Sequence, residues 1–414
     1  MYDFIFQNTD LILEKKNQNT FTIEGYRFKL VGEGTFGIVF KIIYKEHTFI
    51  AKIMKKPDPE PEKLKNIKDK IDKISSGKIE KLITKYITNI QDIYLKSNPQ
   101  VIIFEYLDGI DLSEYLKKED EIQDSEFYLI IFKLIISVSL LHNKLKISHR
   151  DLKPQNIFYN PETNNLKLID FGFACNLNDY SCYNRYQGTH NYIHPRMNNK
   201  KINNLQGGSL YGINTKKNVN RQNVNRQNVN RPNVNRQNVN RPNVNRQNVN
   251  RQNVNRQNIK NVSSLKNNNI SRRFPKPRSQ DIFSIIIIIL KIYTYLDYEF
   301  NVEELKLNKF LTVFFSPNIK INIKLNKLKK RLDKKKTLFN NLKTIDHTKI
   351  TNPLISILLK LIKDYWNFKE HNFIVKKKDI SKKVLNDLLN ICIKNIKEPK
   401  LKKIFINEMK IIYS

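Results

Sequence analysis

Cysteine is scarce in this chain. The 414 residues include three cysteines, Cys175, Cys182 and Cys392, which are too few for a disulfide framework. Chains without such a framework are typical of reducing compartments, so we expect an intracellular, cytoplasmic location, with the nucleus as an alternative. The N-terminus, Met1-Tyr2-Asp3-Phe4, has no basic region before an apolar run and therefore lacks the pattern of a signal peptide.

The apolar run from Ile282 to Leu290 is short. Ser284 interrupts it and Lys291 ends it, whereas a membrane-spanning helix needs ~20 apolar residues. We therefore predict a buried core helix or strand at this run, and no membrane span.

Acidic residues are few. The chain has 39 Asp and Glu against 74 Lys and Arg, which gives a net charge of +35. Residues 197–280 contain no acidic residue and hold about half of this surplus. Such an imbalance favours an acidic or polyanionic partner.

A five-residue repeat, Asn-Val-Asn-Arg followed by Gln or Pro, fills the chain from about Asn218 to Asn258. A period of five fits neither a helix nor a strand, and one Val per unit buries too little surface to offset the entropy of ordering. We interpret residues 197–277 as a disordered insertion that acts as filler. The alternative is weak RNA or polyanion binding by residues 197–280 through the spaced arginines.

The stretch with the clearest chemical content is Ser148-His149-Arg150-Asp151-Leu152-Lys153-Pro154-Gln155-Asn156-Ile157-Phe158. Asp151 can orient a hydroxyl and accept its proton, Lys153 can meet a phosphoryl group, and the amide oxygen of Asn156 can ligate a metal. Phosphoryl transfer needs little covalent chemistry from a protein, but it needs such groups fixed in line with the phosphate.

Three further motifs accompany this stretch. Leu168-Ile169-Asp170-Phe171-Gly172 follows it, and Gly32-Glu33-Gly34-Thr35-Phe36-Gly37-Ile38-Val39 and Phe49-Ile50-Ala51-Lys52 precede it. The four pieces in this order resemble the eukaryotic protein kinases, and Asp-Leu-Lys-Pro-x-Asn is typical of the serine/threonine branch. The resemblance runs from about Tyr26 to Leu296 and is broken by the insertion.

The resemblance implies an α+β, two-lobed protein kinase fold, with a small antiparallel N-terminal sheet and a mainly helical C-terminal lobe. The expected segments are an unassigned extension (1–24), the N-terminal lobe (25–107), the first part of the C-terminal lobe with the catalytic loop and activation segment (108–196), the insertion (197–277), and the rest of that lobe with a Lys-rich region (278–414).

The resemblance also implies an activity. A serine/threonine protein kinase transfers the γ-phosphate of ATP to a Ser or Thr hydroxyl of a protein substrate, with Mg2+. In that role Asp151 orients the hydroxyl, Lys153 steadies the γ-phosphate, and Asn156 and Asp170 hold magnesium. Lys52 positions the α- and β-phosphates.

The nucleotide is expected between the glycine-rich motif and the hinge. Gly32, Gly34 and Gly37 let backbone N–H groups approach the phosphates, with Val39 beside them; the alternative is that these glycines are ordinary turn residues.

Val101 to Gly109 reads as a buried strand entering the hinge. The family places backbone groups of Glu105 and Leu107 on the adenine edge. Asp111 is expected near the ribose or, equally, as a helix N-terminal charge.

In the family, the lysine at the position of Lys52 pairs with a Glu on the following helix. We predict Glu80, because Leu82, Ile83 and Tyr86 give its helix an apolar side. Glu62 and Asp72 are the runners-up, and a solvated helix charge is the alternative for Glu80.

The motifs around the activation segment have family roles as well. His149 is expected to pack under Phe171, and Arg150 to anchor a phosphorylated activation loop whose candidate acceptors are Tyr180, Ser181, Tyr183 and Tyr186. Thr189 is expected as a docking residue.

The chain also departs from the family pattern. Ile50 replaces the usual Ala above the adenine, and His194 and Arg196 replace the Ala and Glu of the docking turn. These departures support the alternative of a pseudokinase scaffold.

Overall fold

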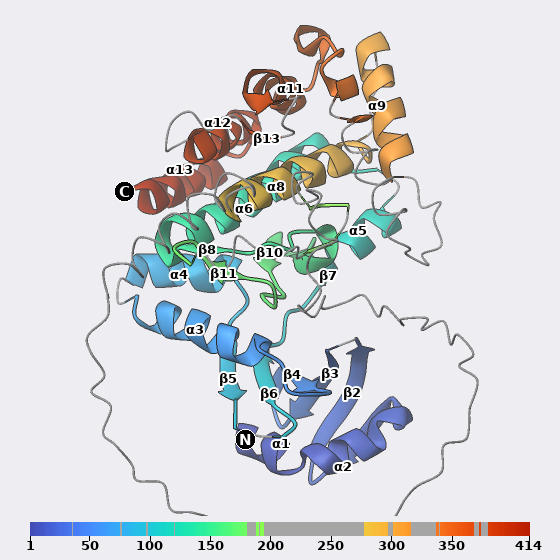
Figure 1. Ribbon diagram of the computed structural model, residues 1–414, viewed down its shortest axis with the longest axis vertical. Helices are drawn as coiled ribbons and strands as arrows, with labels where there is room; N and C mark the ends of the chain where they lie inside the picture. Colours follow the sequence, from blue (N-terminus) through green and yellow to red (C-terminus); the bar gives the residue numbers. More distant parts are fainter. Residues whose placement is uncertain are drawn as a thin grey trace, which may run out of the picture.

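The computed structural model describes residues 1–34, 36–74, 77–96, 98–119, 121–179, 188–189, 191–193, 277–296, 301–315, 337–338, 340–367, 372–373 and 380–414. These residues form two lobes, a sheet-rich one that carries the N-terminus and a helical one that carries the C-terminus (Figure 1). The predicted two-lobed α+β kinase fold is confirmed. The Asn/Arg repeat lies outside the described residues.

The N-terminal lobe is built on an antiparallel sheet. Its six described strands have the order β1-β2-β3-β4-β6-β5. In β4 the buried Phe49 and Ala51 alternate with the half-buried Ile50 and Lys52, so this strand presents one face to a core and the other to the lobe boundary. The strands are β1 (Thr20–Ile23), β2 (Tyr26–Glu33), β3 (Gly37–Tyr44), β4 (His47–Met54), β5 (Ile90–Tyr94) and β6 (Val101–Glu105).

The N-terminal extension packs on the core face of this sheet. It forms α1 (Tyr2–Gln7), α2 (Thr9–Glu14) and the turn η1 (Lys15–Gln18). Ile5 and Ile12 are fully buried with Phe28, Phe40 and Phe49 in one cluster. The extension that the sequence left unassigned is therefore part of the lobe, and it lies on the face opposite Lys52.

Two helices follow β4 before the sheet resumes. They are α3 (Glu60–Asp72) and α4 (Gly77–Tyr86). The Asp58 carboxylate accepts a hydrogen bond from the Glu60 N–H at 2.9 Å, and Pro61 occupies the first turn, so the local sequence starts α3 at this point. Residues of both helices belong to the same core as the helical lobe.

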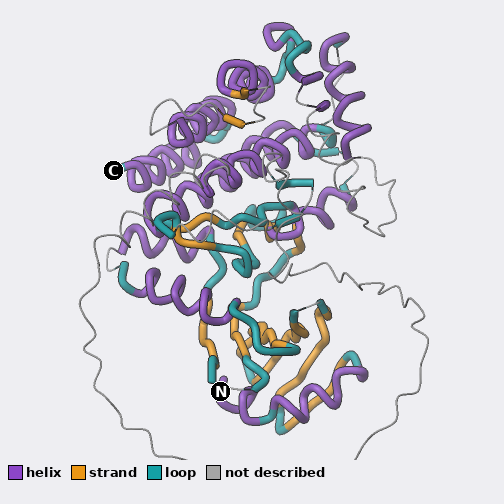
Figure 2. Tube along the Cα trace, viewed as in Figure 1, coloured by secondary structure: helices purple, strands orange, loops and turns teal. Residues whose placement is uncertain are grey.

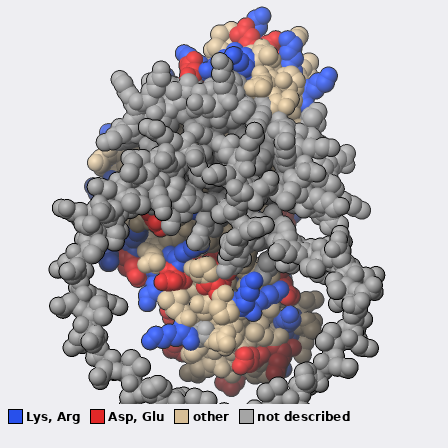
Figure 3. Space-filling view, viewed as in Figure 1, with Lys and Arg blue, Asp and Glu red and all other residues tan. Residues whose placement is uncertain are grey.

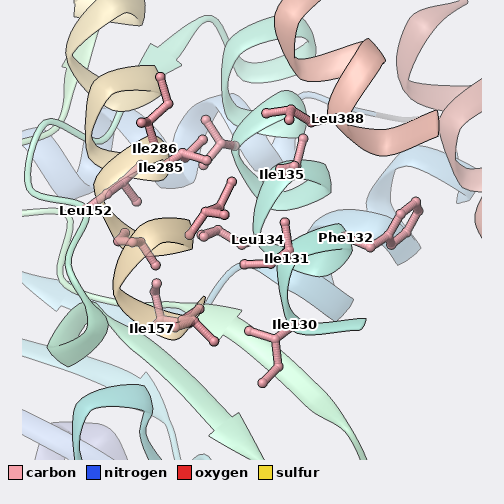
Figure 4. Close-up of a cluster of buried hydrophobic side chains, with 14 of the residues drawn as sticks. Ile130, Ile131, Phe132, Leu134, Ile135, Leu152, Ile157, Ile285, Ile286 and Leu388 are labelled. Carbon is pink, nitrogen blue, oxygen red and sulfur yellow. The ribbon is translucent and has the colours of Figure 1, made fainter. Parts of the chain in front are cut away.

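The helical lobe surrounds α6 (Asp124–Leu140), which continues as the turn η2 (Leu141–Leu145). The helix is apolar all round because neighbours cover every side, α8 and α12 among them. Figure 4 shows Leu152 and Ile157 in one cluster with Ile131 and Ile135 of α6 and Ile285 of α8. The catalytic loop is thus anchored at both ends in this core.

The remaining helices of the lobe are α5 (Leu112–Lys118), α8 (Pro277–Tyr293), α9 (Val302–Phe315), α11 (Pro353–Tyr365), α12 (Ile380–Asn395) and α13 (Pro399–Tyr413), with turns η3 (Pro154–Asn156) and η7 (His347–Lys349). Its short strands are β7 (Ile110–Asp111), β8 (Ile147–Ser148), β9 (Ile157–Asn160), β10 (Asn165–Leu168), β11 (Cys175–Asn176), β12 (Trp366–Asn367) and β13 (Asn372–Phe373). They lie mostly between the long helices and the lobe boundary (Figure 2).

Two apolar stretches bear on the membrane question. The run from Ile282 to Leu290 is a buried part of α8, as predicted. Among the described residues one helix, Asp124–Leu145, is long and apolar enough to cross a membrane by composition, but 89% of its apolar window is buried inside the protein. It is the central core helix of this lobe. Figure 3 shows both basic and acidic side chains on the uncovered part of the N-terminal lobe.

The N-terminal extension predicts a stability effect. Replacing Ile5 by Ala empties a fully buried site between α1 and the sheet, which should lower the free energy of unfolding by about 2–5 kcal/mol. The control is Leu11→Ala, because Leu11 is 38% exposed and its loss should change that energy by less than ~0.5 kcal/mol. Equal chemical-denaturation midpoints for the two variants would contradict the packing of α1.

A buried lysine predicts a pH effect. Burial in α6, with Lys85 nearby, lowers the pKa of Lys133 from 10.5 to about 8. Between these values the folded chain binds fewer protons than the unfolded one, so the contribution of Lys133 to stability rises with pH. Relative to a Lys133→Met variant, the wild type should therefore gain unfolding free energy between about pH 7 and about pH 10. Parallel stability curves for the two proteins would contradict this.

Candidate active site

Lys52 in β4 pairs with Glu60 at the start of α3. The Nζ atom of Lys52 lies 2.5 Å from Oε1 of Glu60, and both side chains are largely buried. Burial raises the pKa of Glu60, while the ammonium group of Lys52 opposes the shift. A buried carboxylate is stable only with such a partner, so the pair fixes α3 against the cleft side of the sheet.

The predicted partner Glu80 is wrong. Glu80 lies on α4 and is exposed to solvent. Its helix has the apolar side that the sequence indicates, through Leu82, Ile83 and Tyr86, but this side packs in the core of the helical lobe. The runners-up Glu62 and Asp72 are also exposed. A signal was available in the sequence, because Glu60 lies between Pro59 and Pro61, six residues after the end of β4 at Met54.

Glu60 also meets the start of the activation segment. A Cβ atom added to Gly172 would lie 3.2 Å from the carboxyl carbon of Glu60, so the approach is close. Lys63, one turn along α3, donates to the Gly172 carbonyl at 3.3 Å. The Asp-Phe-Gly motif and α3 are therefore held together, a contact that the sequence did not predict.

Asp151 is buried at the centre of the catalytic loop. Its carboxylate accepts from Lys153 Nζ at 2.9 Å and from Asn156 Nδ2 at 3.1 Å. The backbone N–H and the hydroxyl of Thr189 donate to its Oδ1 at 2.6 and 2.8 Å. Lys153 also contacts the Thr189 hydroxyl at 3.0 Å. Three predicted residues are thus brought together, and Thr189 joins them from the docking turn.

Gly188 permits the approach of Thr189. Its φ is +114°, and a Cβ there would lie 2.6 Å from the Arg150 carbonyl oxygen. A side chain at this position would strain the backbone and collide with the catalytic loop. Gly188 is therefore required by geometry.

Asn156 and Asp170 are suited to hold a divalent cation. The Nδ2 group of Asn156 donates to the carbonyl and the carboxylate of Asp151, which leaves its Oδ1 as an available oxygen ligand. Asp170 is exposed at the end of the segment after β10, with φ at 61°. One amide oxygen and one carboxylate are the oxygen ligands that magnesium takes alongside water and phosphate.

Asp281 at the start of α8 braces the catalytic loop. Its carboxylate accepts from the Ser148 hydroxyl and from the backbone N–H groups of His149 and Arg150, at 2.8–2.9 Å, and contacts His142 Nε2 at 2.8 Å. Complete burial would raise its pKa, but these hydrogen bonds, led by His142, bring the pKa of Asp281 below its usual range.

His149 has a structural position. It is fully buried, its ring centroid lies 4.9 Å from that of Phe171, and its Nε2 lies 3.0 Å from the Ile169 carbonyl oxygen. His149 therefore packs under the Asp-Phe-Gly motif, as expected.

The three glycines of the glycine-rich motif differ in their surroundings. A Cβ at Gly37 would lie 2.8 Å from the Ile53 carbonyl oxygen, so packing against β4 requires glycine there. A Cβ at Gly32 or Gly34 would meet no atom closer than 3.9 Å, and neither has a positive φ. The Gly34 N–H donates to the Gly37 carbonyl at 2.9 Å in the turn between β2 and β3. The turn-residue and phosphate-binding interpretations of these two glycines therefore both stay predictions. Val39 is half-buried on the same side of the sheet as Lys52, its partner in β4.

The hinge follows β6. Glu105 ends that strand, and its carboxylate pairs with Lys167 of β10 at 2.7 Å. Leu107 lies two residues further on, where the chain crosses to the second lobe. The binding of adenine by their backbone groups stays a prediction. Asp111 accepts from the Glu114 N–H at 2.9 Å and caps α5, which favours the helix-terminus interpretation of this residue.

The comparisons with known proteins agree with this geometry. The family model described as "Protein kinase domain" matches residues 26–273. The chain belongs to the protein kinase family. The site residues from Gly32 to Gly188 lie within the matched segment, whereas Asp281 and the helices from α8 to α13 lie beyond it.

Curated relatives cover part of this kinase. Death-associated protein kinase 2 of Mus musculus is 29% identical over 174 residues, which are 41% of this chain and 46% of the relative. Cyclin-dependent kinase-like 1 of Caenorhabditis elegans is 29% identical over 174 residues, 41% and 47% of the two chains. Ribosomal protein S6 kinase alpha-4 of Homo sapiens is 34% identical over 90 residues, 21% and 12%. Each match covers less than half of the relative's length.

Several predictions about the kinase fall outside the described residues. They concern the docking-turn replacements His194 and Arg196 and residues 197–276 of the insertion, with its proposed RNA binding. The four candidate acceptors of the activation loop, Tyr180, Ser181, Tyr183 and Tyr186, also lie there.

The partner of Lys52 can be tested directly. Glu60→Gln removes the charge that holds Lys52 and α3, so phosphate transfer should fall about tenfold or more. Glu80→Gln is the matched control, because the exposed Glu80 carboxylate should be dispensable. The measurement is the turnover of both purified variants with Mg-ATP and a basic peptide. A larger loss in Glu80→Gln would overturn the correction.

Proposed function

We propose that this kinase transfers the γ-phosphate of ATP to serine or threonine hydroxyls of proteins. The observation that carries the proposal is the cluster around Asp151, whose buried carboxylate has Lys153 at 2.9 Å and Asn156 at 3.1 Å. These groups have the chemistry to orient a hydroxyl, to meet its proton and to steady a phosphoryl oxygen.

The remaining parts suit the same reaction. Lys52, held by Glu60, would meet the α- and β-phosphates, and the open space beside Gly32 and Gly34 supports an approach of these phosphates to the backbone. Asn156 and Asp170 would hold Mg2+, which supplies charge neutralisation at the transferred phosphate when bound. Catalysis in this site is then positioning and electrostatic stabilisation by fixed groups.

The serine/threonine assignment rests on Lys153. In the Asp-Leu-Lys-Pro form this lysine lies beside the target hydroxyl, and its Nζ here bridges Asp151 and the hydroxyl of Thr189. A threonine hydroxyl therefore fits between the ammonium group of Lys153 and the carboxylate of Asp151. We infer that the protein substrate presents Ser or Thr.

A pseudokinase scaffold is the second candidate. Ile50 lies on the same side of β4 as Lys52 and is half-buried, where the family usually has Ala. It belongs to neither hydrophobic core, so its added bulk faces the region where adenine would lie. Such bulk favours weak nucleotide binding without turnover.

One experiment separates the candidates. Asp151→Asn should keep Mg-ATP binding and lower turnover by roughly two or more decades, because hydroxyl positioning is lost. The measurement is transfer of labelled phosphate to a basic peptide, with phosphoamino-acid analysis of the product and Asp170→Ala as the control without the predicted metal ligand.

Full activity in Asp151→Asn would contradict the catalytic assignment, and phosphotyrosine as the main product would contradict the specificity. Binding of Mg-ATP by the wild type without any transfer would favour the pseudokinase.

A further inference from the structure

Glu408 of the C-terminal helix α13 reaches a helix more than three hundred residues earlier in the chain. Glu408 is buried, with 7% of its side chain exposed. It accepts from the Tyr86 hydroxyl at 2.7 Å and from Lys85 Nζ at 2.8 Å, and both of these residues end α4. Burial raises the pKa of Tyr86, which keeps the hydroxyl a neutral donor. A nearly buried carboxylate needs both donors, so this contact fixes the position of α4 relative to α13.

α13 itself is firmly attached to the central helix. Phe405 is fully buried and stacks on Phe132 of α6 with ring centroids 4.0 Å apart. At its end, the Tyr413 hydroxyl lies 3.1 Å from the Ser139 hydroxyl of α6. Glu408 lies between these two anchors, on a helix that cannot shift without disturbing the core. It is therefore a rigid support for Tyr86.

The three residues after Tyr86 connect to two parts of the candidate active site. The Thr88 N–H donates to the Leu168 carbonyl at 3.0 Å, two residues before Asp170. The Asn89 N–H donates to the Glu105 carboxylate at 2.7 Å, and the Glu105 N–H returns a bond to the Asn89 carbonyl at 3.1 Å. Residues 86–89, which we call the junction, therefore tie the metal-ligand strand and the hinge to α13.

The junction is also the continuation of the helices that carry Glu60. α3 leads into α4, and Leu82 and Ile83 of α4 are buried in the core shared with α6. A displacement of α4 would therefore move the elements at both of its ends. At its start it would shift α3 and the pair of Lys52 and Glu60, and at its end it would shift the junction that is bonded to Leu168 and Glu105.

We propose that Glu408 is a positioning residue for phosphate transfer, acting through Tyr86 and the junction on Asp170 and the hinge. The proposal rests on the proposed function for its effect on turnover. Glu408 does not touch the reacting groups, and α13 lies beyond the segment that the family model matches. In this proposal the C-terminal helix α13 helps to position the groups that transfer phosphate.

The test compares Glu408→Ala with Tyr413→Phe in the full-length chain. Both remove a polar contact of α13, but the contact of Glu408 is with Tyr86 of α4, whereas the contact of Tyr413 is with Ser139 of α6. Glu408→Ala should lower kcat between about tenfold and a hundredfold, since small displacements of catalytic groups have effects of this size. Tyr413→Phe should stay close to the wild type, because the stack of Phe405 on Phe132 still anchors α13. Turnover is measured with Mg-ATP and a basic peptide well below the melting temperature of each variant.

Two further variants cover the case in which Glu408→Ala does not fold. Glu408→Gln keeps an acceptor for the Tyr86 hydroxyl and should recover most of the turnover. Tyr86→Phe removes the same hydrogen bond from the other side, and adding it to Glu408→Gln should lower kcat no further than Tyr86→Phe alone. Wild-type kcat in Tyr86→Phe and in any folded Glu408 variant would overturn the proposal.

Amide hydrogen exchange supplies a readout that does not depend on activity. Loss of the contact should speed exchange at Thr88, Asn89 and Glu105, whereas a purely local role would speed exchange in α13 alone and contradict the proposal. If the wild type transfers no phosphate, the proposed function fails on its own, and faster exchange at the junction still supports coupling from Glu408. Unchanged exchange there would refute that coupling.

Discussion

The interaction on which the site depends is the buried carboxylate of Asp281. It lies at the start of α8 and takes donors from Ser148, His149, Arg150 and His142. Without these donors an ionised carboxylate would not be stable at zero exposure, and without the carboxylate two backbone N–H groups of the catalytic loop would be buried and unpaired. The catalytic loop and α8 therefore stabilise one another, although many residues separate them in sequence. Asp151 is held where it is because the residues before it are fixed by Asp281 and Leu152 after it lies in the core.

The sequence was sufficient for the parts of the site whose chemistry lies within one short motif. Asp151, Lys153 and Asn156 are close because a tight loop connects them. The position of Asp170 is also set locally, because it lies two residues after the end of β10. The strands from Tyr26 to Met54 could also be predicted, since alternation and turn residues mark them. The apolar pattern also marks the long buried helix α6 and the later helix α11.

The sequence was insufficient where a choice depends on which surface a helix covers. Glu60 and Glu80 both lie on amphipathic helices after β4, and periodicity alone cannot say which helix faces Lys52. Packing decides it, because α3 begins beside the sheet with Glu60 against Lys52, whereas α4 packs on α6 and β10 of the helical lobe. The N-terminal extension was missed for a related reason. Its helices are too short for a clear period, and Ile5 and Ile12 are apolar anchors only because the sheet offers them a face.

The two faces of the N-terminal sheet therefore have different roles. The extension and the buried aromatic residues stabilise one face, and the other keeps Lys52, Ile50 and Val39 at the boundary between the lobes. α3 contacts both lobes, because its first residue pairs with Lys52 of the sheet while Leu64 and Ile67 lie in the core of the helical lobe. A helix bound at both ends cannot swing far without breaking a buried ion pair or exposing apolar surface. The position of Glu60, and with it the geometry around Lys52, is consequently set by the packing of the helical lobe as much as by the sheet from which Lys52 extends.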